Sequence, residues 1–147
     1  MPAISVSPRL QLTHAWITGL NEKNLDRLAS LSAEDFISTI RPASLGIKPV
    51  GKKEYLERLG SAPIETFNIA LPKTGDIIET EEVIQFYTTA DGRTAHGFEW
   101  KNEYMFTFRF TEDGKLIRSV TEFVDPTVVT TAFSKEAVVA EAQAQSV

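Results

Sequence analysis

The sequence predicts an α+β fold in which helices come first and an antiparallel sheet follows. Residues 8–60 contain three stretches with helical spacing of apolar side chains, and from Ile64 onward the chain has the alternation and turn residues of strands. The 147 residues, 42% hydrophobic and 24% charged, suit one globular domain. We therefore expect a single domain over residues 1–134 and a C-terminal tail over 135–147, either a frayed helix or disordered.

The helical part is punctuated by capping and breaking residues. A first helix is expected over 8–20, a second over 24–32 with Asn24 as its N-cap, and a third over 52–60, where Tyr55 is interpreted as packing. The segment 35–41 between the second and third helices is β-rich and is stopped by Pro42. The first strand therefore lies between helices.

Strand patterns fill the second half of the chain. They cover 64–71, 76–89, 98–110 and 115–124, and the turns "PKTG", "ADG" and "EDG" separate them. Short turns between successive strands indicate an antiparallel meander.

Composition excludes several classes of function. The absence of cysteine and the presence of only two histidines exclude disulfides, thiolate chemistry and His- or Cys-based metal centres. A net charge of −5 without a basic cluster argues against nucleic acid. No apolar run is long enough to span a membrane, and "MPAISVSPRL" lacks the apolar core of a signal peptide, so we expect a cytoplasmic protein. A small molecule or another protein remains as partner.

The stretch "FEWKNEYMFTFRF" places one amide in a row of aromatic residues. Its even positions are Phe98, Trp100, Asn102, Tyr104, Phe106, Phe108 and Phe110, whereas the odd positions are mostly polar. The even face is therefore predicted to be buried. A buried amide must meet a polar group, a water or a ligand, because leaving it unpaired costs about 1–3 kcal/mol.

The partners of Asn102 depend on the turn in "TEDGK". A three-residue loop with Gly114 left-handed pairs Thr111 with Lys115, and the same register pairs Phe110 with Leu116, Phe106 with Val120, Tyr104 with Glu122 and Asn102 with Val124. This register places Glu122 on the aromatic face. A two-residue Asp-Gly turn instead sends Glu122 to the opposite face, and the sequence leaves both open.

In the first register, Glu122, Tyr104 and Asn102 converge among Trp100, Phe106 and Val120. Burial raises the pKa of a carboxyl, which suits a general acid or base near neutral pH. The structural alternative is an exposed glutamate and an asparagine that fixes backbone.

Several motifs resemble known proteins over the chain up to about Phe133. The stretch "WITGLNEKNLDRLASLSAEDF" resembles the opening helices of ketosteroid isomerases and other SnoaL-like proteins of the NTF2-like superfamily. In order, "PASLG", "NEYM", "EDGK" and "EFVD" look like the fungal SnoaL-like family with isomerases and cyclases of meroterpenoid biosynthesis. "KNEYMFTF" with "TEFVDP" is also similar to the phenazine-biosynthesis A/B proteins.

This resemblance implies a cone in which a curved antiparallel sheet wraps around three N-terminal helices, with a pocket at its mouth. Glu122, followed by Asp125, matches an acid/base carboxylate on the last strand of limonene-epoxide hydrolases and phenazine proteins. The ketosteroid isomerase pattern is not matched. The first-strand histidine of many fungal isomerases is also missing, because Ser38 and Thr39 stand there.

Other candidates have a structural alternative beside the functional one. Arg41 is expected to pair with Glu122 or to hold an anionic substrate, or else to be a solvated charge. His96 is a candidate proton shuttle on the pocket rim, or an exposed turn residue. His14 is interpreted as a core histidine, and Trp16 and Trp100 as core residues at positions that line the cavity in this fold.

We therefore predict a cofactor-free, metal-free enzyme that isomerises, cyclises or dehydrates a hydrophobic polycyclic or terpenoid-like metabolite of secondary metabolism. Its catalytic residues are Glu122, Asn102 and Tyr104, and its substrate-binding residues are Trp16, Arg41, Trp100, Phe106, Val120 and His96. The alternative is a non-catalytic NTF2-like module that binds a ligand or dimerises. In either case a homodimer is expected through the outer sheet face, with Met105, Thr107, Ile117, Thr121 and Phe123.

Overall fold

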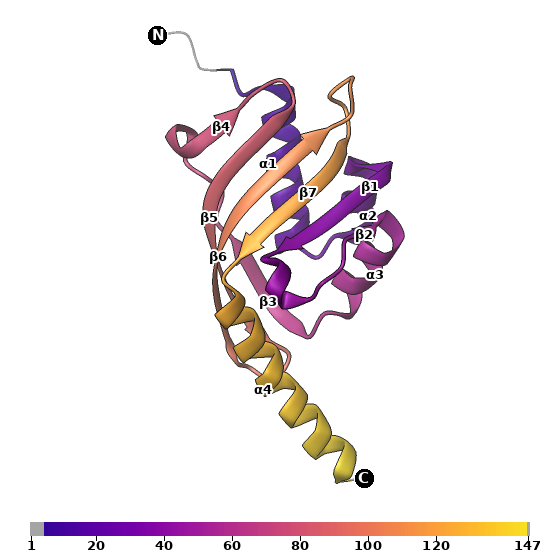
Figure 1. The fold of residues 1–147 in the computed structure, drawn as a ribbon, viewed down its shortest axis with the longest axis vertical. Helices are drawn as coiled ribbons and strands as arrows, with labels where there is room; N and C mark the ends of the chain where they lie inside the picture. The colour runs from indigo at the N-terminus through magenta and orange to yellow at the C-terminus, as the bar shows by residue number, and fades with distance from the viewer. Residues whose placement is uncertain (1–4, 147) are drawn as a thin grey trace.

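A computed structural model describes residues 5–146, and residues 1–4 and 147 lie outside the described part. The predicted α+β class is confirmed: helices pack against one face of an open, curved sheet (Figure 1). The part of "MPAISVSPRL" before residue 5 and the last residue of the expected tail are therefore outside the described residues.

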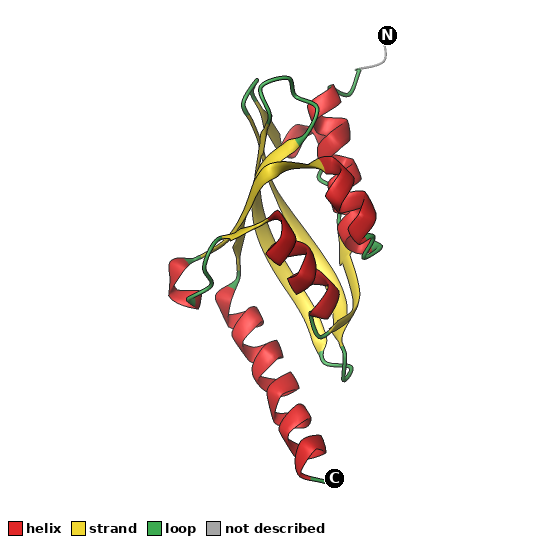
Figure 2. Ribbon diagram, turned by 90° about the vertical axis from the view of Figure 1, so that its right-hand side faces the viewer, coloured by secondary structure: helices red, strands yellow, loops and turns green. Residues whose placement is uncertain are grey.

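Three helices lie on one face of the sheet (Figure 2). They are α1 (Pro8–Asn21), α2 (Leu25–Leu31) and α3 (Lys52–Ser61). The side chain of Asn24 accepts a hydrogen bond from the N–H of Arg27, which confirms its prediction as the N-cap of α2. The helices cover the concave face because their apolar sides bury Trp16, Ile17 and Leu28 completely.

The sheet is mixed rather than purely antiparallel. Its strands are β1 (Ser32–Arg41), β2 (Val50–Gly51), β3 (Ile64–Ile69), β4 (Ile77–Glu79), β5 (Val83–Thr94), β6 (Glu99–Phe110) and β7 (Ile117–Val124). The order is β2-β1-β7-β6-β5-β3, with β4 beside β5, and β1 pairs with β7 in parallel. This parallel pair brings the end of β1 alongside Glu122 in β7, since Ile40 is the register partner of Glu122.

The turn predicted at residues 90–92 is wrong, because these residues lie within β5. Gly92 instead allows β3 to approach β5 closely, because a Cβ at this position would stand 2.1 Å from the carbonyl oxygen of Thr66 in β3. The chain turns at residues 95–98, where Gly97 has φ of 81°. Strand 76–89 is also divided, because β4 ends at Glu79 before β5 begins.

The predicted register of the β6–β7 hairpin is wrong by two residues. Tyr104 pairs with Val124, and Phe106 pairs with Glu122. Gly114 is left-handed as expected, with φ of 69°, but the N–H of Thr111 donates to Leu116 at 2.9 Å, so the loop is longer. The longer loop shifts the register by one residue, and a bulge near Arg109 and Phe110 shifts it by a second residue. A shift of two keeps Glu122 on the inner face.

Because of the bulge, the prediction that Ile117 lies on the outer face of the sheet is wrong. Ile117 pairs with Phe110 and is fully buried, so it does not belong to the outer surface of the sheet. The outer side chains that remain exposed include Met105 and Phe123.

The C-terminal segment is a long helix, α4 (Pro126–Gln145), which runs away from the sheet and ends far from the N-terminal side of the molecule (Figure 1). Asp125 caps it by accepting a hydrogen bond from the N–H of Thr127 at 2.9 Å. The boundary expected after residue 134 falls inside this helix. Phe133 anchors the helix to β6, with its ring 5.5 Å from that of Trp100.

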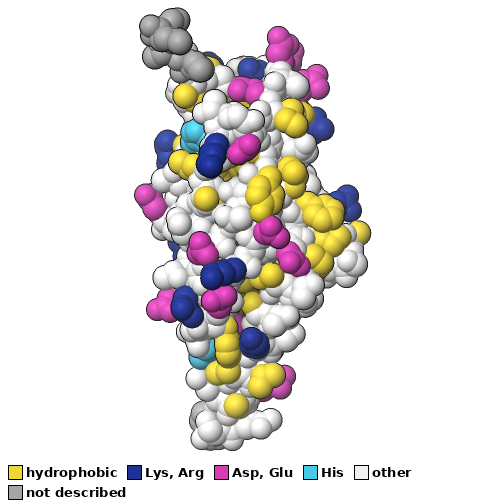
Figure 3. All heavy atoms as spheres, turned by 90° about the vertical axis from the view of Figure 1, so that its left-hand side faces the viewer, with side chains coloured by type: hydrophobic (Ala, Val, Ile, Leu, Met, Phe, Trp, Pro, Cys, Tyr) yellow, Lys and Arg dark blue, Asp and Glu magenta, His cyan; other side chains and the backbone are white. Residues whose placement is uncertain are grey.

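The surface on the side of β4 and β5 is mixed. Hydrophobic side chains alternate there with acidic and basic ones (Figure 3). No helix in the described residues 5–146 combines the length and apolar character that crossing a membrane requires.

Candidate active site

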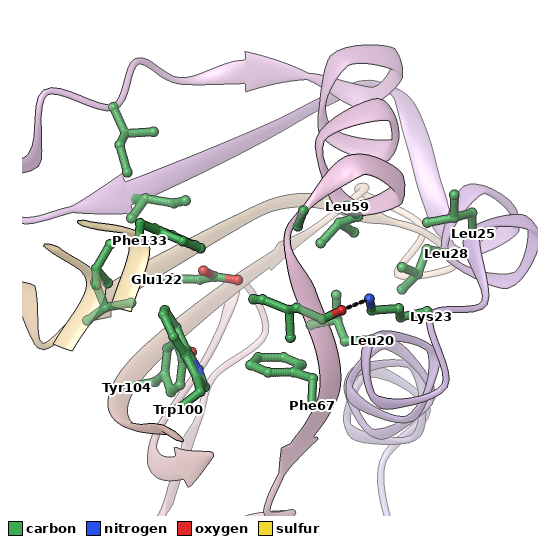
Figure 4. A pocket seen from close by; sticks show the side chains of 16 residues that line it. Leu20, Lys23, Leu25, Leu28, Leu59, Phe67, Trp100, Tyr104, Glu122 and Phe133 are labelled. Carbon is green, nitrogen blue, oxygen red and sulfur yellow. Dashed lines mark hydrogen bonds between the residues drawn. The ribbon is translucent and has the colours of Figure 1, made fainter. Parts of the chain in front are cut away.

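An apolar cavity of about 160 Å³ lies between the helices and the inner face of the sheet. Residues of α1, α2, α3 and α4 and of β1, β3, β6 and β7 form its wall, which includes Leu20, Leu28, Leu59, Phe67, Trp100, Tyr104, Glu122 and Phe133 (Figure 4). A wider groove of about 720 Å³ on the side of β2 and α3 shares Ile40, Ile47, Leu59, Ala62, Glu122 and Phe133 with it. Glu122 therefore lies where cavity and groove meet.

The Glu122 carboxyl points into the cavity from β7 (Figure 4). Its register neighbours on the inner face are apolar on both sides, Ile40 in β1 and Phe106 in β6. Burial raises the pKa of Glu122 to about 7. Half of such carboxyls are protonated near neutral pH, so the group can both give and accept a proton.

Tyr104 stands beside Glu122 in the same cavity. The indole N–H of Trp100 donates to the Tyr104 hydroxyl at 3.3 Å, and both side chains come from inward positions of β6. Burial, and then the charge of Glu122, raise the pKa of Tyr104 well above its usual value. Tyr104 therefore stays protonated and can donate its hydroxyl hydrogen.

Asn102 has a mainly architectural environment. Its side-chain oxygen accepts hydrogen bonds from the backbone N–H of Glu103 at 2.8 Å and of Asp125 at 3.1 Å. The second bond fixes the junction between β7 and α4, which answers why the aromatic row contains an amide. Its Nδ2 is buried without a partner among the described residues, and Asn102 does not line the cavity or the groove.

The structure separates the other predicted binding residues into three groups. Trp100 lines the cavity. Trp16, Phe106 and Val120 are fully buried in the core behind it. Arg41 is exposed and, as the register partner of Phe123, lies on the outer face of the sheet, so it is not beside Glu122.

His96 lies in the β5–β6 turn and contacts α4 rather than the cavity. Its backbone N–H donates to Glu136 at 2.8 Å, its Nδ1 is 2.5 Å from the same carboxylate, and its Nε2 is 3.3 Å from Gln143. The structure therefore joins His96 to the helix and not to Glu122.

Sequence reasoning missed three residues of the site. Tyr55 from α3 lines the groove, and Phe133 from α4 lines both spaces. Lys23 closes the far end of the cavity and donates to the carbonyl of Ile64 (Figure 4). Helical spacing marked Tyr55 as inward-facing, but the positions of Phe133 and Lys23 depend on helix directions that no local pattern encodes.

Within residues 5–146, no cluster of three His, Cys, Asp or Glu side chains is arranged to hold a metal ion.

Comparisons with known proteins agree with this fold. The model of the SnoaL-like domain family matches residues 13–119. The pinacolase BvnE of Penicillium brevicompactum has a TM-score of 0.79 and 25% identity, covering 90% of this chain and 96% of that one. PrhC of Penicillium brasilianum has a TM-score of 0.78 and 17% identity, covering 89% of each chain, and it shows likeness of fold.

One curated relative has a different kind of name. It is monooxygenase ptaG of Pestalotiopsis fici, 22% identical over 121 residues, which cover 81% of this chain and 83% of that protein. The match of the domain model to most of the chain identifies the family directly. This protein belongs to the SnoaL-like domain family.

Proposed function

We propose that the protein is a cytoplasmic, cofactor-free acid–base enzyme that isomerises, cyclises or dehydrates a hydrophobic polycyclic or terpenoid-like metabolite of secondary metabolism. One observation carries the proposal. A carboxyl group with a pKa of about 7, Glu122, projects into a cavity whose walls are otherwise almost entirely apolar.

Glu122 accounts for each of these reactions through one proton. As a carboxylate it removes a proton from a carbon of the substrate, and as the acid it returns that proton to another carbon, which completes an isomerisation. As the acid it protonates a hydroxyl group that leaves as water, or an alkene that is then attacked by a second alkene of the same molecule. The carboxylate left behind then takes a proton from the carbon beside the cation, which forms the new double bond and restores the acid. Tyr104 orients the substrate or the carboxyl by donating a hydrogen bond.

The walls indicate the substrate class. Leu20, Leu25 and Leu28 form an apolar end opposite Glu122, and Phe67 lies between them and the carboxyl (Figure 4). Burial of apolar surface contributes about 25 cal/mol per Å². The similarity to a fungal pinacolase supports chemistry on a small metabolite. The name of the fungal monooxygenase relative alone does not favour oxidation here, because identity to it is 22%.

The proposal can be tested without the natural substrate by deuterium exchange. We expect the protein to catalyse exchange of the protons beside the carbonyl of α-tetralone in D₂O, measured by NMR. Exchange should rise with pH through about 7 and then level off, because the carboxylate of Glu122 is the base. Glu122→Gln should slow the catalysed exchange by about 10²–10⁴.

The matched control is Glu65→Gln, which changes an exposed glutamate of β3. This variant should exchange at the wild-type rate. Exchange that survives in Glu122→Gln would remove Glu122 from the chemistry.

A non-catalytic module that binds a hydrophobic ligand is the second candidate. It is favoured by the apolar lining and by the single carboxyl on the cavity wall. Binding of α-tetralone without catalysed exchange, in the wild-type protein, would support this module and contradict the enzyme.

We also propose that the protein forms a homodimer through the outer face of the sheet. Tyr87, Met105 and Phe123 are exposed neighbours on three successive strands, with Thr107 and Thr121 in the next row. Such a mixed apolar surface suits a twofold interface.

A further inference from the structure

The hydroxyl of Tyr55 is buried, and no acceptor among the described residues takes its hydrogen. The residue is only 6% exposed, and its ring lies 5.8 Å from that of Trp16 and 5.3 Å from that of Phe36. A phenylalanine would make the same ring contacts. An unpaired buried hydroxyl destabilises the fold, so its presence points to a partner that binds from outside.

Tyr55 faces the groove that Glu122 also lines. Burial and then the charge of Glu122 raise the pKa of Tyr55, as they do that of Tyr104. The two phenols therefore approach the same carboxyl from different elements, Tyr55 from α3 and Tyr104 from β6. Both remain protonated at physiological pH and act as hydrogen-bond donors.

The two phenols are not equivalent. The Tyr104 hydroxyl already accepts a hydrogen bond from Trp100 within the cavity. Tyr104 has the side chain of Asn102 as a second hydrogen-bonding neighbour. The side-chain neighbour of Tyr55 is Trp16, whose ring N–H can only donate, so the hydrogen of the Tyr55 hydroxyl has no acceptor among the described residues. A donor is thus held in place by aromatic packing while its hydrogen-bonding capacity is unused.

We propose that Tyr55 is a specificity-determining residue whose hydroxyl donates a hydrogen bond to an oxygen atom of the substrate. The inference rests on the proposed function of Glu122 and adds a requirement to it. The substrate is a hydrophobic ring compound with a carbonyl, ether or hydroxyl oxygen near the atom that exchanges a proton with Glu122. A hydrocarbon of the same shape lacks this contact.

The test compares two probes of nearly equal shape, the ketone α-tetralone and the hydrocarbon tetralin, by calorimetric titration. Wild-type protein should bind the ketone more tightly, and Tyr55→Phe should weaken ketone binding about five- to tenfold while tetralin binding stays unchanged. The carbonyl stretching band of bound α-tetralone should move to higher frequency in Tyr55→Phe, because the carbonyl loses a hydrogen bond.

Two controls separate recognition from folding. Tyr55→Phe should keep or raise the melting temperature, since it removes an unpaired buried hydroxyl. Tyr87→Phe changes an exposed tyrosine of the outer face and should leave both affinities unchanged. Equal ketone binding by wild type and Tyr55→Phe, loss of selectivity only in Tyr104→Phe, or failure of both probes to bind would overturn the inference.

The outcome is distinguishable from that of the proposed function. If Glu122 is not a catalytic residue, the deuterium exchange is absent in the wild type or survives in Glu122→Gln, while the ketone preference and its loss in Tyr55→Phe persist. If only the Tyr55 inference is wrong, exchange remains sensitive to Glu122→Gln, and Tyr55→Phe binds each of the two probes with the same affinity as the wild type.

Discussion

At the scale of single residues, Glu122 is set apart by what surrounds it. The side chains beside it across the sheet are Ile40 and Phe106, and no ion pair within residues 5–146 compensates its charge. A cavity that keeps the carboxyl poised between its two protonation states also makes its ionised form costly. The same feature that suits catalysis therefore lowers stability at high pH.

This cost gives a prediction for the pH dependence of stability. The pKa of Glu122 is raised from 4.5 to about 7, so the native state binds the proton more tightly than the unfolded chain. The free energy of unfolding should fall as pH rises from about 4.5 to 7, by up to about 3.5 kcal/mol at 1.4 kcal/mol per pKa unit. Glu122→Gln should abolish this fall, as urea unfolding at several pH values would measure.

The comparison needs a glutamate that lies outside the cavity. Glu65→Gln should keep the wild-type pH dependence. Near pH 4 the wild type, Glu65→Gln and Glu122→Gln should have similar free energies of unfolding. At pH 8 the wild type and Glu65→Gln should both be less stable than Glu122→Gln. A Glu122→Gln protein with the wild-type pH profile would place the carboxyl in water and contradict its burial.

Residue types in the sequence predicted part of this site. Alternation in β6 correctly predicted that Asn102 and Tyr104 are buried, because the strand period is local. The role of Asn102 was not predictable in the same way. Its oxygen binds the N–H of Asp125, 23 positions away, and this contact depends on where β7 ends.

At the scale of elements, α4 forms one side of the cavity through Val129 and Phe133. The ring of Phe133 against Trp100 holds one part of the helix, and the contacts of His96 with Glu136 hold the next turn. The buried Glu136 is attached to the β5–β6 turn both through a backbone N–H and through an imidazole. The second of these contacts depends on pH.

We predict that α4 is held most firmly between about pH 4.5 and 6.5. A hydrogen bond to Glu136 raises the pKa of His96 above 6.5, although burial opposes it. Burial alone would raise the pKa of Glu136, but hydrogen bonds from Thr94 and His96 lower it from 4.5 to about 2. The contribution of His96 is lost as pH rises through its raised pKa, and that of Glu136 as pH falls toward 2.

Hydrogen exchange of the α4 amides, corrected for the intrinsic rate, would measure this dependence. Protection should fall about two- to fivefold between pH 6 and pH 9 in the wild type. Glu136→Gln should remove the change, whereas Glu141→Gln, an exposed site on the same helix, should retain it. Protection that varies with pH equally in all three proteins would show that the pair does not hold the helix.

The helices and strands that a local sequence pattern determines were predictable. Those features that depend on tertiary contacts were not. The helices and the strand-rich second half follow from periodicity, and Asn24 from capping chemistry. The hairpin register was not predictable, because the bulge near Arg109 changes the pairing without any turn residue. Residues 90–92 have the composition of a turn, but β3 packs on Gly92 and keeps them in β5.

At the scale of the whole molecule, the two faces of the sheet have different partners. The inner face meets helices and the cavity, whereas the outer face of β5, β6 and β7 carries Tyr87, Met105 and Phe123 at 49%, 41% and 52% exposure. These three side chains are adjacent across the strands. The surface on the side of β4, in contrast, mixes hydrophobic with charged side chains (Figure 3).

The last prediction concerns the assembly. If the outer row forms the centre of a twofold interface, light scattering at micromolar concentration should give twice the chain mass of 16.3 kDa. Phe123→Lys should shift the protein to monomer, because the symmetry places two like charges near each other in a desolvated contact. Ile78→Lys is the matched control, since Ile78 is 63% exposed on β4, outside the row, and this variant should remain dimeric. A wild-type protein that stays monomeric would contradict the interface. The cavity would be unaffected by that outcome, because none of the three outer side chains lines it.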